Sequence, residues 1–193
     1  MEFLSKKLTD YILKKNVIEK ENYEIYQYGF ESALETMFCF ASAIAIAAFM
    51  HAIPQALFFS FFFLLMGSYT GGLHLKTFRA CYIFSCLLLV ACLFLAKNVS
   101  AYPIVSTMIY AASVLVILIT GPVDHPNKPV EESDSKRFML RSYIILGISI
   151  VTAIALFISG NRSYLFLEAV TFAFIAITGI LGKAFNRYTG VTD

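Results

Sequence analysis

One histidine and one cysteine, His74 and Cys81, stand seven residues apart in a short polar stretch between two apolar runs. A cysteine acts as a nucleophile when a base or a cationic neighbour favours its thiolate and when a substrate can reach it. His74 is the only histidine of this stretch, so it is the residue able to take the thiol proton and to return it to a leaving amine. The pair therefore predicts cleavage of an amide bond beside a membrane.

The spacing of the pair restricts the backbone between its two members. Seven residues of one unbroken helix would separate them by about 10.5 Å along the axis, which is too far for a hydrogen bond. The chain must therefore turn between them, with freedom supplied by Gly71 and Gly72, or a second chain must supply the histidine. Thr77 is suited to be the N-cap of a helix that carries Cys81 in its first turn, where the helix dipole favours an anion.

Two basic residues, Lys76 and Arg79, stand close to Cys81 in the sequence and would favour a thiolate there. On spacing alone, the plainer interpretation that a histidine and a cysteine share a loop by chance stays open. We expect no metal site, because two ligand side chains fall short of the usual three or four. The remaining cysteines lie in apolar runs and are expected to be free structural thiols: Cys39, Cys86 and Cys92.

The composition indicates that most of the chain lies in a membrane. Of its 193 residues, 59% are hydrophobic and only 15% are charged. A soluble domain of this size keeps too much wet surface to hide so many apolar side chains. The formal net charge of +2 gives no reason to expect nucleic-acid binding.

Six apolar segments approach the length of about 20 residues that a helix needs to cross a bilayer. We therefore expect an all-α membrane protein: an amphipathic N-terminal segment at 1–31, a six-helix transmembrane domain at 32–181 and a short tail at 182–193. The six expected spans are Ser32–Met50, Gln55–Thr70, Cys81–Ala96, Pro103–Thr120, Ser142–Ser159 and Tyr164–Leu181.

The lysines and arginines predict the orientation of these spans. With six spans, thirteen of the fifteen lie on one side of the membrane, and only Lys97 and Arg162 lie on the other. Loops rich in these residues face the cytoplasm. We therefore expect both termini, His74 and Cys81 on the cytoplasmic side, where thiols stay reduced.

The N-terminal segment carries an apolar stripe at helical spacing, formed by Leu4, Leu8, Tyr11 and Ile12, with lysines on its other faces. Such a stripe suits a helix that lies on the membrane surface with its lysines toward anionic headgroups. It equally suits a helix packed on the cytoplasmic end of a bundle. Both interpretations stay open.

A third group to orient His74 is expected among three acidic residues, Glu31, Glu35 and Asp124. An acidic side chain one turn inside a span is costly and is often functional. Near a helix start it also serves as an anion stabilised by the dipole, so no single candidate stands out. Glu168 falls near the opposite side of the membrane, and we expect its role to be structural.

At these residues the sequence resembles the accessory gene regulator B (AgrB) family of bacterial membrane cysteine endopeptidases. Gly71–His74 followed by Cys81 is similar to the family pattern of two glycines, one residue, a histidine and a cysteine seven positions on. Tyr28–Glu31 resembles the Tyr-Gly-x-Glu before the family's first span, and Gly121–Pro129 resembles its Pro-Val-Asp…Lys-Pro loop. The resemblance covers essentially the whole chain.

The resemblance implies a specific reaction without a cofactor. Cys81 would attack the scissile carbonyl near the C-terminal part of an AgrD-like precursor peptide, with His74 as the base. An internal thiol or hydroxyl of the peptide would then close a thiolactone or lactone ring, giving a precursor of a cyclic quorum-sensing pheromone. The implied setting is a bacterial cell membrane, and a homodimer is expected by analogy. The chain departs from the family pattern at Gly67, where members often have an arginine, and at Arg79, which stands two positions before the cysteine instead of one.

Two other classes of function stay open on the residues alone. A small transporter or peptide-binding membrane protein would move the precursor without cutting it, but it would need a polar path that the spans barely offer. An acyltransferase would use Cys81 as a carrier, although nothing in the sequence supplies the usual signatures of that class. Replacing Cys81 by serine separates these classes, because only transport should survive the change.

Overall fold

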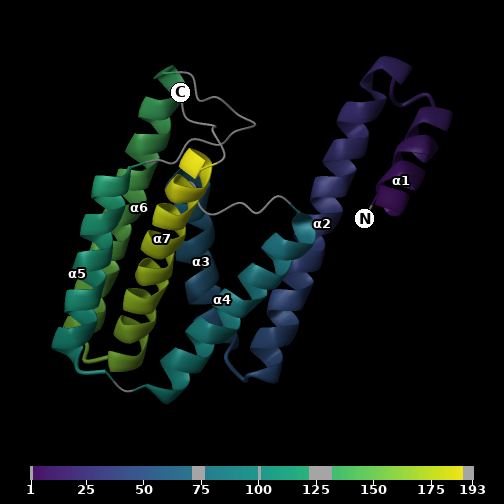
Figure 1. The fold of residues 1–193 in the computed structure, drawn as a ribbon. Helices are drawn as coiled ribbons and strands as arrows, with labels where there is room; N and C mark the ends of the chain where they lie inside the picture. Colours follow the sequence, from purple (N-terminus) through teal and green to yellow (C-terminus); the bar gives the residue numbers. More distant parts are fainter. Residues whose placement is uncertain (1, 71–76, 100, 122–131, 189–193) are drawn as a thin grey trace. The chain divides into compact units, whose positions relative to one another are not determined.

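The computed structural model describes residues 2–70, 77–99, 101–121 and 132–188. These ranges contain α-helices, one short 3-10 helix and no strand, so the expected all-α class is confirmed (Figure 1). The helices are α1 (Glu2–Lys14), η1 (Lys20–Asn22), α2 (Tyr23–Phe49), α3 (Ile53–Thr70), α4 (Phe78–Asn98), α5 (Pro103–Thr120), α6 (Glu132–Ile158) and α7 (Arg162–Tyr188).

A helix occurs at each of the six expected apolar segments, and most of these helices are longer than the segments themselves. The first expected span began at Ser32, whereas α2 begins at Tyr23. Hydropathy marks only the apolar stretch, while backbone hydrogen bonding continues into the polar flanks. Within the described ranges, five helices are long and apolar enough to cross a membrane. The sixth, α3, runs from Ile53 to Thr70, and its apolar stretch is described over Ile53–Gly67, so the count of six spans stays a prediction.

The chain divides into two compact units, Met1–Phe49 and Met50–Asp193. In the first unit, α1 folds back along α2 (Figure 1). The face of α1 toward α2 is small and polar: Ser5 and Thr9 are fully buried, and each hydroxyl donates to a carbonyl of its own helix. The Tyr23 hydroxyl donates to the Asp10 carboxylate at 2.8 Å and ties the two helices together.

Most of the apolar stripe of α1 is exposed, and of its four residues Ile12 is half-buried. Leu4, Leu8 and Tyr11 remain exposed, as does Phe3 beside them. A helix that buries its small hydroxyl side chains and exposes its large apolar ones is suited to a second contact on its outer face. A position on the membrane surface supplies such a contact, and it stays a prediction.

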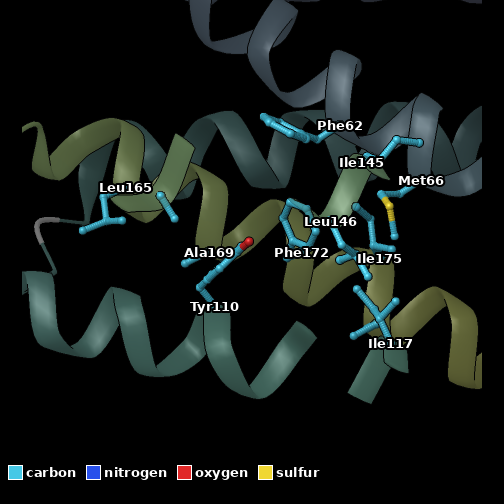
Figure 2. Close-up of a cluster of buried hydrophobic side chains, with 12 residues drawn as sticks. Phe62, Met66, Tyr110, Ile117, Ile145, Leu146, Leu165, Ala169, Phe172 and Ile175 are labelled. Carbon is cyan, nitrogen blue, oxygen red and sulfur yellow. The ribbon is translucent and has the colours of Figure 1, made fainter. Parts of the chain in front are cut away.

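In the second unit, α7 contacts each of the other four helices and is the most buried of the spans. Figure 2 shows its Phe172 among side chains of the neighbouring helices, with ring centres 5.1 Å from Tyr110 and 5.7 Å from Phe62. Lipid tails are as apolar as leucine, so packing and hydrogen bonds, more than the hydrophobic effect, hold such helices together. The cluster comprises Phe62, Met66, Tyr110, Ile117, Ile145, Leu146, Ala153, Leu165, Ala169, Phe172, Ile175 and Ala176.

Two lysines join helix ends in this unit. Lys97 at the end of α4 donates to the carbonyl of Met50, just before α3, and Lys183 of α7 donates to the carbonyl of Thr120 at the end of α5. One end of this unit holds Met50, the last turn of α4 and the first turns of α5 and α7. We call it the Met50 end. The opposite end holds the first turn of α4, and we call it the Cys81 end.

Candidate functional site

Cys81 lies in the first turn of α4, and Thr77 caps this helix. Thr77 has extended backbone angles, and its side-chain oxygen accepts a hydrogen bond from the Ala80 N–H at 3.4 Å. Its carbonyl accepts the Cys81 N–H at 3.1 Å, which is the first turn of the α-helical ladder. The expected N-cap is therefore confirmed, and Cys81 lies at the positive end of the α4 dipole.

The part of α4 that carries Cys81 is only lightly covered. Its fully buried residues, Leu89, Cys92 and Leu93, all belong to the second half of the helix, which includes the contact with α7. Cys81 itself is half-buried, and Ile83 and Leu87 are more than half exposed. A nucleophile needs this partial access.

The side chains around Cys81 are arranged by helix geometry. At about 100° per residue, Arg79 projects about 160° away from Cys81, and its side chain is exposed. Phe78 and Tyr82 project within about 100° of Cys81 on one side, and their rings stack at 6.0 Å. The thiol is therefore flanked by an aromatic pair, while the neighbouring guanidinium is directed elsewhere.

Several predicted site residues lie outside the described residues. These are the presumed base and its glycines, one basic neighbour and one acidic candidate: Gly71, Gly72, His74, Lys76 and Asp124. The pairing of a histidine with Cys81 therefore stays a prediction.

The acidic candidates Glu31 and Glu35 lie one turn apart on α2, half-buried, in the first unit. On α1, the Glu2 carboxylate lies 2.7 Å from the Lys6 ammonium group, and its hydrogen bond and charge raise the pKa of Lys6. The charge of Glu31 raises the pKa of Lys6 by a smaller amount. Glu31 therefore lies within electrostatic range of α1, which gives it a structural partner there. Its role toward His74 stays a prediction, as does that of Glu35.

None of the other cysteines forms a disulfide, which agrees with the expectation of reduced thiols. Cys92 is buried, and its sulfur lies 3.9 Å from the Thr171 hydroxyl of α7. Cys92 and Cys81 project from nearly the same face of α4, but Cys92 lies about 16 Å farther along the helix axis. Cys39 and Cys86 are half-buried. Within the described ranges, no three histidine, cysteine or acidic side chains gather closely enough to hold a metal ion.

The structure buries Glu168 of α7, for which the sequence predicts a structural role. Its side chain has no exposed surface, and neither carboxylate oxygen has a hydrogen-bond partner among the described residues. The signal in the sequence was a lone carboxyl group inside an apolar segment, which is costly in a membrane and often functional.

Comparisons with known proteins agree with the sequence motifs. The family model described as accessory gene regulator B (AgrB) matches residues 5–185. A relative in Clostridium perfringens (strain SM101 / Type A), named "Putative AgrB-like protein", is 24% identical over 72% of this chain and 68% of its own length. "Putative AgrB-like protein 2" of Clostridium perfringens (strain 13 / Type A) is 23% identical over 83% of this chain and 80% of its own. No solved structure matches. Because the family model spans nearly the whole chain, this multi-pass membrane protein belongs to the accessory gene regulator B (AgrB) family.

Proposed function

We propose that this protein is a membrane cysteine endopeptidase that cleaves an AgrD-like precursor peptide and promotes its cyclisation. Membership of the AgrB family gives it a role in the agr quorum-sensing system, together with an AgrD-like precursor. The observation that carries the proposal is the position of Cys81, half-buried in the first turn of a capped helix whose first half is lightly covered. A thiol is suited to nucleophilic attack in such a place.

In the proposed reaction, His74 takes the proton of the Cys81 thiol, and the sulfur forms a bond to the carbonyl carbon of the scissile amide. The positive end of the α4 dipole stabilises both the thiolate and the oxyanion that forms. The C–N bond then breaks, and the leaving amine takes the proton from His74. The peptide remains bound to Cys81 as a thioester.

The second step closes the ring. A thiol or hydroxyl of the same peptide attacks the thioester carbonyl, its proton passes through His74 to the Cys81 sulfur, and the C–S bond breaks. A thioester keeps much of the activation of the acyl group, whereas attack by water would waste it. Holding the internal nucleophile near the carbonyl and keeping water out are therefore what the site must do.

The surface beside Cys81 suits a peptide that lies along the membrane. The stacked rings of Phe78 and Tyr82 form an apolar surface beside the thiol, whereas the exposed Ile83 and Leu87 project from another face of α4. An amphipathic precursor would place its apolar side chains on this surface and its scissile bond at the first turn. The apolar character of the first half of α4 supports a membrane-associated substrate over a soluble one.

The test is incubation of the purified full-length protein in lipid vesicles with a synthetic precursor, followed by mass spectrometry. The wild-type protein should give a product lighter by one water than the linear fragment. Cys81→Ser should abolish cleavage, because a hydroxyl at this position is a far weaker nucleophile. Cys86→Ser is the matched control, since Cys86 projects about 140° away on the same helix and should leave the product unchanged.

Two results would contradict the proposal. Cleavage by the Cys81→Ser protein at the wild-type rate would remove Cys81 from the reaction. If the wild-type and Cys81→Ser proteins both moved uncut precursor across the vesicle membrane, the result would favour a transporter.

A further inference from the structure

Glu168 stands apart from the proposed catalytic chemistry. It lies in the second turn of α7, about 9 Å along the axis from Arg162, and is therefore nearer to the Met50 end than to the Cys81 end. Cys92, which contacts α7 three residues farther on at Thr171, lies about 16 Å along α4 from Cys81. Glu168 therefore serves another purpose than holding the nucleophile.

The carboxyl group of Glu168 is fully buried and unpartnered in the described part of the chain. Both of its oxygens lack a hydrogen-bond partner, and no other charged side chain described by the structure is buried. It lies within a helix long and apolar enough to span a membrane. A charge in such surroundings is very costly unless it is paired.

No counter-ion is available from the helices packed against α7. The sequences of α3 and α5 contain no acidic or basic residue, and the charged residues of α6 all lie in its first ten positions. On α4, Arg79 and Lys97 are exposed near the two ends of the helix. Among the described residues of the helices packed against α7, the titratable groups near Glu168 are Tyr110 of α5, which lies within its electrostatic range, and Cys92 of α4, which contacts Thr171. On α7 itself, Tyr164 stands one turn before Glu168.

The hydroxyl groups of Tyr110, Ser149 and Thr171 already have other hydrogen-bond partners. The Ser149 hydroxyl donates to the Leu146 carbonyl at 3.1 Å, so the Tyr110 hydroxyl, 2.5 Å from Ser149 Oγ, is the donor in that pair. The Thr171 hydroxyl donates to the Leu167 carbonyl at 2.7 Å. A metal cation would need several oxygen ligands at once. The committed hydroxyls do not form such a set, whereas a proton needs only the carboxyl group.

We propose that Glu168 is a proton-binding site inside the bundle, which keeps its proton as long as α7 is packed against α4 and α5 as described. The neutral acid avoids most of the cost of burying a charge, and that cost returns as soon as the proton leaves. Without its proton, the Glu168 carboxylate would attract the Tyr110 hydroxyl. That hydroxyl can donate to Glu168 only by breaking its hydrogen bond to Ser149 on α6. The proton on Glu168 thereby keeps the hydrogen bond between α5 and α6 intact.

The first experiment detects the proton directly. The full-length protein, labelled with ¹³C-glutamate and purified in lipid, is studied by infrared spectroscopy at neutral pH, where exposed glutamates are ionised. We expect a carbonyl stretching band of a neutral carboxylic acid in the wild-type protein. This band should be lost in Glu168→Gln and kept in the matched control Glu24→Gln, which changes an exposed residue of α2.

Absence of the band in the wild-type protein overturns the proposal whether or not the variant folds. Persistence of the band in Glu168→Gln overturns it as well, because the proton would then belong to another residue.

The second experiment measures thermal unfolding in detergent as the pH is raised. The packed bundle holds a proton that the unfolded chain releases, so the stability of the wild-type protein should decline as the pH rises above the range in which an exposed glutamate ionises. Glu168→Gln is a neutral isostere and should show a smaller decline. Parallel curves of stability against pH for the two proteins overturn the proposal. Stabilisation of the wild-type protein, but not of the variant, by sodium ions overturns it as well.

Discussion

At the scale of single residues, Thr77 begins the helix that carries the proposed nucleophile. Thr77 accepts the N–H of Ala80 with its side chain and the N–H of Cys81 with its carbonyl. These two hydrogen bonds start α4 at Phe78 and place Cys81 in its first turn. The chemistry of the thiol therefore depends on a local, short-range feature of the chain.

Removing this cap should slow the reaction without unfolding the protein. Thr77→Val keeps the shape of the side chain but loses the acceptor, at a cost of about 1 kcal/mol to the start of the helix. We expect slower precursor cleavage and faster hydrogen exchange of the amides after residue 77, with unchanged membrane insertion. Thr77→Ser keeps the acceptor and should behave like the wild-type protein. Unaltered exchange in Thr77→Val would show that the cap does not hold this turn.

At the scale of helices, α4 combines two tasks. Its second half contributes Leu89, Cys92 and Leu93 to the interior, with Cys92 against α7, and its first half carries Cys81 with little covering. A helix packed at one end and open at the other holds a reactive group rigidly while leaving it accessible. The proton-binding site proposed at Glu168 lies on α7 near the packed half of α4, so both sites adjoin α4 without sharing residues.

The helix α1 also divides its faces, and two substitutions test this. Ser5 is fully buried, so Ser5→Leu should overpack the contact with α2 at a cost of about 1–3 kcal/mol and raise hydrogen exchange along α1. Leu4→Ser changes an exposed position and should leave this exchange unchanged while weakening attachment of an isolated N-terminal peptide to anionic vesicles. Equal exchange in both variants would contradict the observed packing face.

At the scale of the whole molecule, membership of the AgrB family is shown and the number of membrane crossings stays open. The distribution of lysine and arginine predicts six crossings with both termini in the cytoplasm. Helix α3, whose apolar stretch is described over Ile53–Gly67, is the one that does not count among the five spans. The orientation of Cys81 relative to the N-terminus depends on whether α3 crosses.

Cysteine labelling decides between five and six crossings. In a cysteine-free background, a membrane-impermeant thiol reagent should label Asn98→Cys in intact cells, because Lys97 beside it is one of the two basic residues expected outside. Phe3→Cys and Lys183→Cys should react only after permeabilisation. Labelling of Phe3→Cys in intact cells, with Lys183→Cys still protected, would mean that α3 does not cross.

Local features of this chain were predictable from the sequence. The apolar segments located all six long helices, since about 20 apolar residues leave the backbone no other way to satisfy its hydrogen bonds in lipid. Thr77 was predictable as a cap because capping involves only the next few residues. The family resemblance at Gly71–His74 and Cys81 was confirmed by the match over residues 5–185.

Only the tertiary structure decided which faces of these helices meet. A span that is apolar all round carries no stripe to mark its buried side, so nothing in the periodicity identified α7 as the central helix. The burial of Glu168 and the contact of Cys92 with Thr171 depend on segments far apart in the chain, and the polar packing face of α1 depends on its contact with α2. Their relative positions follow from the close packing of side chains and from interhelical hydrogen bonds, each worth little alone, and those are properties of the assembled bundle.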